Sequence, residues 1–581
     1  FIKNWNETYA YPKMRIATNR EMMEALEKRY CDQLPVHKGD FTPYWEDGAA
    51  SSALETGINR KTADQLIQAE TLWSMLDRST DNKPRFDEAW KNVVLFSEHT
   101  WGAAGSKSEP DSDFTKDLWR VKQSFALDAE KESQQLVEDA LQTVASQEDL
   151  IEAFQVINTT SWDRTDLVTL PASWNLRYDK IEDETGKAVE TQRLRDGSLA
   201  FVARNVPALG AKKYYAKKGK VKSRSESSIT AHSISNDQLS VALDPESGNI
   251  TSLTRGNGRN TIDEKDSLGF NAYWYGGLIK ENMKHHGEAS FDVIEKGPVV
   301  NTIRVTSSAP AAESLTRDIQ VVNGLDRVYL TNVVDKKRVT DNENVRFTFP
   351  FNIPNSQVRV DIPWGTMQPE KDQLKGANKN FYSVQRWVDV SNENMGVTLA
   401  TVEAPLLEIG DMNGQKWMAD MAVRPWIKKY EPSNRIISWV MNNAWFVNYK
   451  AYQDGKIPFH YVLRPHEGFD DFETKKFGIE QTQPLIAVPV SKDADTITPL
   501  LQLQDGANVL ITSLKQSRDG RALMVRFFNP TDEPGKATLV WKALTPSSMY
   551  TSSPREEQGT VADNFITLDP WEVKTIRVEL P

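Results

Sequence analysis

The stretch IQVVNGLDRVYL (residues 319–330) decides the fold, because its pattern is that of two strands joined by a turn. Apolar and polar residues alternate on both sides of Asn323-Gly324, and this dipeptide is typical of a tight turn between antiparallel strands. The same alternation occurs in Ile303-Arg304-Val305 and continues, with interruptions, to the end of the chain. We therefore predict that nearly everything after residue 150 is antiparallel β structure.

The chain before residue 150 has a helical period instead. Apolar residues recur three and four positions apart over 49–76, 86–94 and 118–140, which is the spacing of one buried face on an α-helix. We predict that these segments form three antiparallel helices of a bundle. The acidic run at 110–113 has the residue types of a metal site, but acidic residues just before a helix usually cap its free amide groups. We interpret this run as a helix cap.

Length and patterning together predict the fold class. A chain of 581 residues exceeds the size of a single hydrophobic core. We predict a multidomain α plus β protein, in which a three-helix bundle is followed by several antiparallel β-sandwich domains, the last of them immunoglobulin-like. Proline and glycine placement divides the chain into 1–48, 49–150, 151–215, 216–480 and 481–581.

Composition argues against several classes of protein. The formal net charge of −11 disfavours non-specific binding to nucleic acid, which depends on Lys and Arg neutralising phosphates. We interpret the basic and aromatic stretch 212–222 as a solvated connector between two β-domains. No apolar run reaches the about 18 residues that a membrane helix needs. We therefore expect neither nucleic acid nor a membrane as a partner.

Cysteine usage leaves the cellular compartment open. Cys31 is the only cysteine, so no disulfide can form within the chain. The first residues lack the charged-then-apolar layout of a signal peptide. A periplasmic or extracellular location is the expectation.

A glycine-bounded loop at 39–48 is the first candidate site. It places Asp40, Tyr44 and Trp45 close together in the sequence, with two further carboxylates. An aromatic face stacks on the apolar face of a sugar ring, and carboxylates accept hydrogen bonds from sugar hydroxyls. The loop therefore predicts a sugar-binding surface. The alternative is a structural loop, since acidic and aromatic loops before helices are common.

His99, at the end of the second predicted helix, is the second candidate. Neutral imidazole is the commonest protein ligand for zinc, and a histidine where a helix gives way to a loop can point into a cleft. A hydrogen-bonded interior or surface histidine is the alternative. His285 and His286 are adjacent, and no histidine pair has the spacing that places two metal ligands on one face of a helix.

At these two loops the sequence resembles glycoside hydrolase family 38, the zinc-dependent retaining α-mannosidases, in the subgroup of bacterial and archaeal members. Ordered matches in both halves of the chain carry the resemblance. They are Gly39-Asp40-Phe41, Tyr44-Trp45, Glu98-His99-Thr100-Trp101-Gly102-Ala103, Pro110-Asp111-Ser112-Asp113-Phe114, Gly297-Pro298, Phe347-Thr348-Phe349-Pro350-Phe351, Gln385-Arg386-Trp387-Val388-Asp389 and Glu403-Ala404-Pro405-Leu406.

The resemblance implies a domain plan and a composite active site. Family members combine an N-terminal α/β barrel with a three-helix bundle and β-domains, here including a galactose-mutarotase-like supersandwich. Residues 1–48 would be the end of the barrel. The resemblance implies that His99 is a zinc ligand. The substrate-binding residues that it implies are Trp45, Tyr44, Asp40 and Tyr275, although an aromatic residue in a strand, as at the last position, more often belongs to the core.

Departures from the family pattern shape the expected activity. Family members carry their His-x-Asp zinc pair, nucleophilic Asp and general acid upstream of the Tyr-Trp loop, and no His-x-Asp precedes Tyr44 here. Thr100 also stands where animal members carry a sugar-binding aspartate. We therefore expect the C-terminal part of an α-mannosidase, with no catalytic residue of its own, no retained zinc and no hydrolysis by the chain alone.

The expected partners are an α-mannoside oligosaccharide and an N-terminal catalytic domain. Two other interpretations stay open. The chain could be a non-catalytic carbohydrate-binding or assembly module, or it could be one subunit of a two-chain enzyme. An α/β domain with His-x-Asp, encoded directly upstream, would distinguish the first interpretation from these two.

Overall fold

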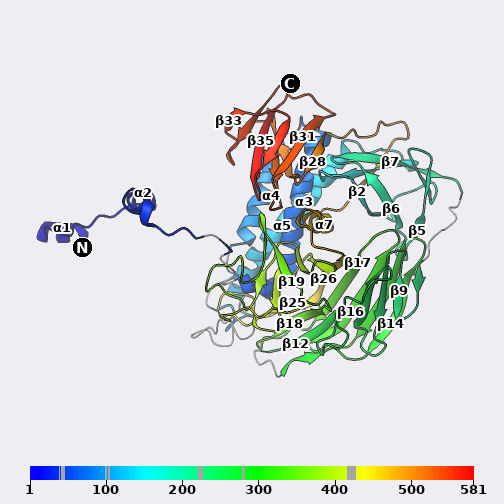
Figure 1. The fold of residues 1–581 in the computed structure, drawn as a ribbon, viewed down its shortest axis with the longest axis horizontal. Helices are drawn as coiled ribbons and strands as arrows, with labels where there is room; N and C mark the ends of the chain where they lie inside the picture. Colours follow the sequence, from blue (N-terminus) through cyan, green and yellow to red (C-terminus); the bar gives the residue numbers. More distant parts are fainter. Residues whose placement is uncertain are drawn as a thin grey trace.

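The computed structural model describes residues 1–37, 39–40, 46–98, 101–102, 105–219, 227–277, 282–414, 427–445 and 447–581. Helices α1 (Ile2–Thr8) and α2 (Asn19–Tyr30) and the 3-10 turn η1 (Cys31–Gln33) form an arm that lies apart from the body of the molecule (Figure 1). In the body, the helices lie between a terminal β-domain and a larger β-domain.

The predicted three-helix bundle is present as α3 (Ala53–Leu76), α4 (Lys83–Phe96) and α5 (Asp113–Gln142). Its core residues have the helical spacing of the sequence, and they include Leu66, Ala69, Ala89, Ala129 and Leu136. The stretch before α3 differs from the prediction. Glu46–Ser52 forms the 3-10 helix η2, because side chains of the β-half bind its backbone groups in place of α-helical hydrogen bonds.

The acidic run before α5 acts as the predicted helix cap. Ser112 is the N-cap residue, and its Oγ accepts a hydrogen bond from the amide of Thr115 at 3.3 Å. Asp111 forms ion pairs with Lys116 and Arg338. The run is therefore explained by a helix cap and by ion pairs with the bundle and the large β-domain.

The large β-domain consists of two main sheets with a shared core. The first contains β13 (Lys284–His285), β12 (Ala272–Gly276), β18 (Asn344–Pro350), β25 (Arg435–Asn442), β24 (Leu406–Ile409) and β21 (Tyr382–Ser383). The second contains β14 (Ala289–Lys296), β15 (Val300–Ser307), β16 (Ala312–Val322), β17 (Val328–Lys336), β26 (Gly455–His466), β23 (Gly396–Thr401), β22 (Trp387–Ser391), β19 (Gln357–Ile362) and β20 (Gly365–Met367). Side chains from both sheets form one hydrophobic cluster, which includes Leu330, Phe347 and Tyr461.

Residues 319–330 form the predicted hairpin. Strands β16 and β17 pair antiparallel on either side of Asn323-Gly324, with Val321 opposite Val328. A smaller sheet packs on the same core and contains β11 (Ile250–Arg255), β10 (Leu239–Leu243), β9 (Ser233–Ser235) and β8 (Ser228–Ile229).

Two sheets lie between the bundle and the large domain in chain order. One contains β2 (Arg164–Leu170), β6 (Leu199–Val206) and β5 (Thr191–Arg193). The other contains β27 (Ile486–Val490), β1 (Ala153–Asn158), β7 (Gly210–Lys217), β3 (Lys180–Asp183) and β4 (Ala188–Val189). Strand β27 follows the large domain and α7 (Asp471–Thr482), so the chain returns to complete this earlier sheet.

The last residues form the predicted terminal sandwich. One sheet contains β28 (Leu501–Ala507), β31 (Gly535–Trp541) and β34 (Phe565–Leu568). The other contains β29 (Leu510–Gln516), β30 (Ala522–Phe528), β35 (Val573–Glu579), β32 (Ser548–Ser552) and β33 (Gln558–Val561). Leu523, Val525 and Ile576 lie in the core between them.

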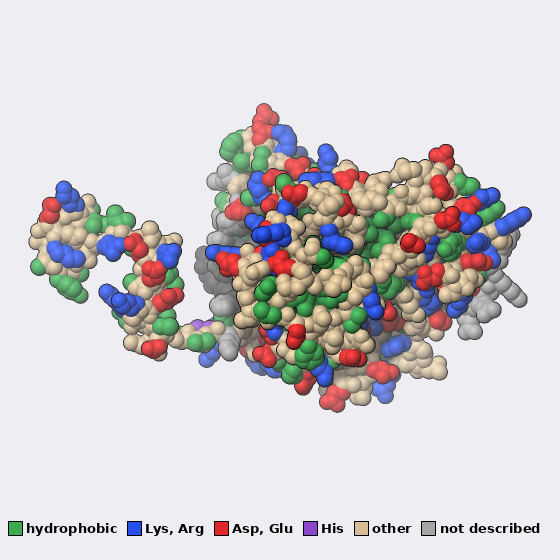
Figure 2. All heavy atoms as spheres, turned by 90° about the horizontal axis from the view of Figure 1, so that it is seen from above, with side chains coloured by type: hydrophobic (Ala, Val, Ile, Leu, Met, Phe, Trp, Pro, Cys, Tyr) green, Lys and Arg blue, Asp and Glu red, His purple; other side chains and the backbone are tan. Residues whose placement is uncertain are grey.

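The surface matches the charge expected from composition. On the face shown in Figure 2, acidic and basic side chains are interspersed and no basic stripe runs across it. In the described ranges, no helix combines the length and the apolar composition needed to cross a bilayer.

Candidate functional site

The predicted site residues divide into described and undescribed ones. Tyr44, Trp45 and His99 lie outside the described residues. Asp40 and Tyr275 are described, and so are the residues that flank the two candidate loops. The described part of the candidate site is therefore the set of residues that support the two loops.

Asp40 is held against the large β-domain through its backbone. Its amide donates to the carbonyl of Asp372 at 2.8 Å, and its carbonyl accepts from the amide of Leu374 at 3.0 Å. Gly39 makes this approach possible. It has φ +126°, and a Cβ there would lie 2.7 Å from the Asp372 carbonyl oxygen. The chain thus enters the first candidate loop from a fixed point on the β-half.

The residues after the first loop are clamped to the end of β25. The Asn442 amide donates from Nδ2 to the Asp47 carbonyl at 2.8 Å and accepts at Oδ1 from Ser51 Oγ at 3.1 Å. Gln453 acts in the same way. It donates to the Ala50 carbonyl at 2.8 Å and accepts from the Ala53 amide at 2.7 Å. These bonds satisfy backbone groups that an α-helix would otherwise pair internally.

The residues after the second loop bind the same β-segment. The Trp101 amide donates to the carbonyl of Asn448 at 2.8 Å. Ser106 Oγ donates to the carbonyl of Tyr449 at 2.7 Å. Trp101 is 4% exposed and packs edge-on against Phe96 of α4. Both candidate loops are therefore anchored on one segment of the β-half, residues 442–453, which we call the anchor segment.

Tyr449 marks the place where the two loops meet. Burial raises the pKa of its hydroxyl, and the nearby carboxylates of Asp47, Glu46 and Glu98 raise it further. The first two of these acids belong to the first loop, and Glu98 belongs to the second. The Tyr449 ring also lies directly on Gly48, where a Cβ would come within 2.2 Å of it. Carboxylates from both loops therefore act on the hydroxyl of one tyrosine.

A buried ion pair supports this meeting point from the bundle side. Lys450 Nζ lies 3.0 Å from Glu55 Oε1 of α3, and Gln123 of α5 donates to the same oxygen at 2.9 Å. The Lys450 ammonium also lies 5.2 Å from the centre of a Trp101 ring. The anchor segment is therefore fixed by two of the three bundle helices.

Tyr275 of β12 joins the framework through Glu343. Burial raises the pKa of the Tyr275 hydroxyl, as do the charge of Glu343 and a hydrogen bond with it. Glu343 also lies 2.8 Å from Lys336 Nζ. Its backbone amide donates to Asn443 Oδ1 of the anchor segment at 2.8 Å. The structure thus links Tyr275 to the anchor segment through one intermediate residue.

Sequence reasoning missed the anchor segment. Its buried amides Asn442 and Gln453 lie about 400 positions away from the residues that they hold, so no local pattern connects them. A weak signal was available. Two adjacent asparagines follow an apolar stretch there, and asparagine side chains commonly form hydrogen bonds with backbone groups.

The metal prediction stays a prediction. In the part of the chain that the structure describes, no group of three or more His, Cys, Asp or Glu side chains could hold a metal ion. His99, the predicted zinc ligand, is outside that part. The described donors by themselves do not make a zinc site, which needs three or four protein ligands.

Two segments of the chain match known family descriptions. Residues 234–404 match the family 38 C-terminal domain of glycosyl hydrolases. Residues 508–576 match the C-terminal beta sandwich domain of the same family. None of the curated proteins compared with the chain matches it.

Solved structures show the same fold over the whole chain. An alpha-mannosidase from Enterococcus faecalis is 14% identical with a TM-score of 0.75, and the match covers 100% of this chain and 74% of that one. A protein in the glycosyl hydrolase family 38 from the same organism is 15% identical with a TM-score of 0.71, covering 100% of this chain and 75% of the other. At these identities the likeness is one of fold.

Proposed function

We propose that this chain, which carries two C-terminal domains of glycosyl hydrolase family 38, supplies one wall of the sugar pocket of an α-mannosidase. In this proposal Tyr44 and Trp45 stack on a mannose ring, and Asp40 and Tyr275 bind its hydroxyls. His99 contributes one ligand to a zinc ion. The natural substrate is an α-mannoside oligosaccharide.

One observation carries the proposal: both candidate loops are anchored on residues 442–453. The hydrogen bonds of Asn442 and Gln453 hold the first loop, and the carbonyls of Asn448 and Tyr449 hold the second. Two loops whose flanking residues are fixed on one support are suited to presenting side chains to one ligand, because the fold sets the positions of the loop ends.

The chemistry of hydrolysis requires more groups than this wall contains. A retaining glycosidase uses one carboxylate as nucleophile and a second as general acid, about 5 Å apart across the sugar bond. In the proposal these groups and the remaining zinc ligands come from an N-terminal catalytic domain. When bound, zinc would orient sugar hydroxyls and stabilise charge on the distorted ring. The residues of this chain would bind and orient the sugar and exclude water.

Ligand-observed NMR with methyl α-D-mannoside tests the pocket wall. We expect saturation transfer from the chain to the mannoside, weaker transfer to methyl α-D-galactoside, and loss of both in Trp45→Ala. Tyr11→Ala is the matched control, since Tyr11 is 88% exposed on the separate arm. Equal transfer from wild type and Trp45→Ala would contradict the assignment of the pocket.

A kinetic assay tests the need for a catalytic domain. With zinc and 4-nitrophenyl α-D-mannoside, we expect no turnover by the chain alone. Turnover that persists after repurification, and that His99→Ala abolishes, would show that the chain carries its own nucleophile and would overturn this part of the proposal.

A further inference from the structure

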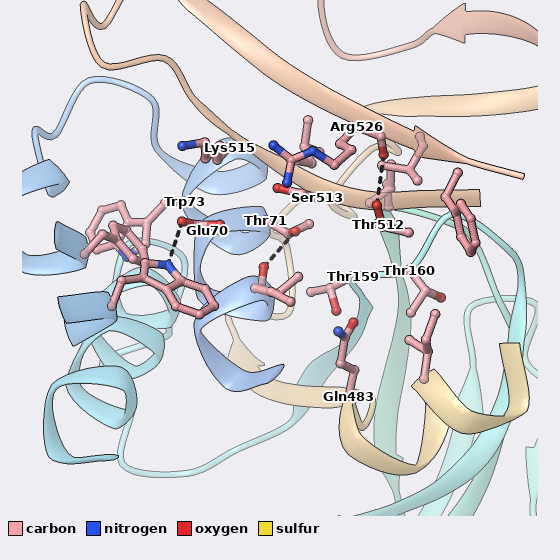
Figure 3. A pocket seen from close by; sticks show the side chains of 18 of the residues that line it. Glu70, Thr71, Trp73, Thr159, Thr160, Gln483, Thr512, Ser513, Lys515 and Arg526 are labelled. Carbon is pink, nitrogen blue, oxygen red and sulfur yellow. Dashed lines mark hydrogen bonds between the residues drawn. The ribbon is translucent and has the colours of Figure 1, made fainter. Parts of the chain in front are cut away.

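A second cavity lies away from the candidate loops, at the junction of the bundle and the β-domains. Its volume is about 540 Å³, which is in the size range of small-molecule sites. Glu70 of α3, Trp90 of α4, Thr160 after β1, Trp364 between β19 and β20, and Arg526 of β30 all line it. Figure 3 shows that Glu70, Thr160 and Arg526 reach the cavity from different parts of the chain.

The cavity is basic although the protein is acidic. Six lining residues are basic and two are acidic, whereas the whole chain has a net charge of −11. Most of these cations have carboxylate partners. Lys515 Nζ lies 3.1 Å from Glu556, Arg518 lies 3.4 Å from Asp87, and Arg386 and Lys475 pair with Asp64 and Asp361. Lys83 Nζ lies 3.4 Å from Asp81, so five of these six cations have a carboxylate partner, and the attraction for an anionic ligand comes from the sixth.

Arg526 differs from the other five. Within the described ranges no carboxylate forms an ion pair with it, and Nε donates to Thr575 Oγ1 at 3.3 Å. In Figure 3 its guanidinium extends beside Ser513 towards Lys515, above Glu70 and Thr71. The planar guanidinium can bind a carboxylate or phosphate through two parallel hydrogen bonds.

Glu70 is, with Asp87, one of the two acidic residues that line the cavity. Burial raises the pKa of its carboxyl, while Lys515, the hydrogen bond from Trp90 and Arg526 oppose the shift. Trp90 Nε1 donates to Glu70 Oε1 at 3.1 Å. The Glu70 carboxylate therefore competes with an external anion for Lys515 and Arg526.

Trp364 contributes an aromatic ring to the cavity wall, and its backbone has an unusual conformation. It occupies the third position of the Ile362–Gly365 turn with φ +59°, where glycine or asparagine is preferred. Trp364 is nearly half exposed, at 46%. Its ring packs edge-on against the ring of Phe528, with 5.3 Å between the ring centres. Residues in sparsely populated backbone conformations persist where the surrounding structure holds them, and they are concentrated at ligand-binding sites. Hydroxyls of Thr71, Thr160, Thr512 and Ser513 line the space below.

We propose that this cavity binds an acidic sugar, a uronate or a sugar phosphate, as a second site independent of the mannose pocket. Arg526 and Lys515 bind the acid group. The rings of Trp364 and Phe528 contact the apolar face of the sugar, and the threonine and serine hydroxyls pair with its hydroxyls. The proposal does not depend on the function proposed above.

Isothermal titration of the full chain tests it, with D-glucuronate, mannose 6-phosphate, inorganic phosphate and methyl α-D-mannoside as probes. We expect binding of at least one acidic sugar at millimolar concentration or tighter, weakened by added salt. Inorganic phosphate and the neutral mannoside should bind at least tenfold more weakly. The two acidic sugars distinguish a carboxylate ligand from a phosphate ligand.

Variants test the two sides of the site. Arg526→Gln should weaken binding tenfold or more, since hydrogen bonds to charged groups are lost. The control Arg521→Gln, in the same domain with a side chain 77% exposed, should bind as wild type does. Glu70→Gln should tighten binding, because a competing carboxylate is removed. A purely structural role for Glu70 would not give that direction, and this variant keeps the test valid if Arg526→Gln does not fold.

Trp364→Gly provides a further readout. It relieves the unfavourable φ, so we expect the thermal midpoint to change little while affinity for the acidic sugar falls. The proposal is overturned if neither acidic sugar binds, if Arg526→Gln binds as tightly as wild type, or if inorganic phosphate binds as tightly as the sugars.

Discussion

Gly48 is where the residues after the first loop meet the β-half. A Cβ at this position would lie 2.2 Å from the Tyr449 ring, far inside contact distance. We expect Gly48→Ala to force the ring or η2 to move and to destabilise the protein by about 1–3 kcal/mol, as overpacking generally does. The urea midpoint measures this.

Gly105→Ala is the matched control for Gly48→Ala. A Cβ at Gly105 would meet nothing within 4 Å, although the residue lies in the neighbouring loop. Its urea midpoint should stay close to that of wild type. If both variants had the same midpoint, the close approach of Tyr449 to η2 would be wrong.

Arg346 and Glu408 form a fully buried ion pair within the large β-domain. Arg346 Nε lies 2.5 Å and Nη2 3.1 Å from the carboxylate, and both side chains are 0% exposed. Glu408→Gln leaves a buried guanidinium without its counter-charge, which typically costs about 3–5 kcal/mol. We expect a large fall in the unfolding midpoint. In the control Glu24→Gln, whose partner Arg20 is exposed, the change should stay under about 1 kcal/mol.

His286 gives the stability a defined pH dependence. Burial and, to a smaller extent, the charge of Arg317 together lower the pKa of its imidazole from 6.5 to about 3. The folded state therefore keeps His286 neutral where the unfolded state binds a proton. The contribution of neutral His286 to the free energy of unfolding is fully present above pH 6.5. It is lost as the pH falls towards 3, with a slope of up to about 1.4 kcal/mol per pH unit.

Unfolding measured between pH 7 and pH 4 checks this contribution. His286→Gln should reduce the number of protons taken up on unfolding by about one, and the slope of the free energy of unfolding against pH should fall accordingly. The control is His37→Gln, because His37 is exposed, whereas His285 contacts His286 and its charge contributes to the His286 pKa. An unchanged slope in His286→Gln would contradict the account.

At the scale of elements, η2 depends on side chains from the β-half. Gln453 donates to the Ala50 carbonyl and accepts from the Ala53 amide. Gln453→Leu removes a hydrogen bond from each of these buried groups, which costs about 1–3 kcal/mol for each group. Hydrogen exchange should therefore become faster at 46–53. Slow exchange retained there would show that η2 is stable without the clamp.

The elements differ in how far the sequence predicts them. The bundle and the β16–β17 hairpin follow from period and turn residues, because local patterning fixes both. The 3-10 conformation of η2 does not, since the hydrogen bonds that hold it come from Asn442 and Gln453. Strand β27 is similar. Its apolar stretch predicts a strand, but only the tertiary fold determines that it pairs with β1.

At the scale of the whole molecule, long-range contacts define both sites. The candidate loops of the bundle are anchored on residues 442–453, and the basic cavity has walls from α3, α4, α7, β30 and the β19–β20 turn. Residue types at 39–48 indicate a sugar-binding surface and His99 indicates a zinc ligand, and both stay predictions. Their common support could not be predicted, because buried amides hold backbone groups and leave no periodic signal.

Photoaffinity labelling with a diazirine-bearing aryl α-D-mannoside tests the central claim most directly, namely that both loops and the anchor segment form one mannose-binding wall. Peptides cross-linked to the probe are identified by mass spectrometry, with and without excess methyl α-D-mannoside. We predict competed labelling within 39–51, 97–107 and 442–453. Competed labelling confined to other peptides, such as those lining the basic cavity, would contradict the account.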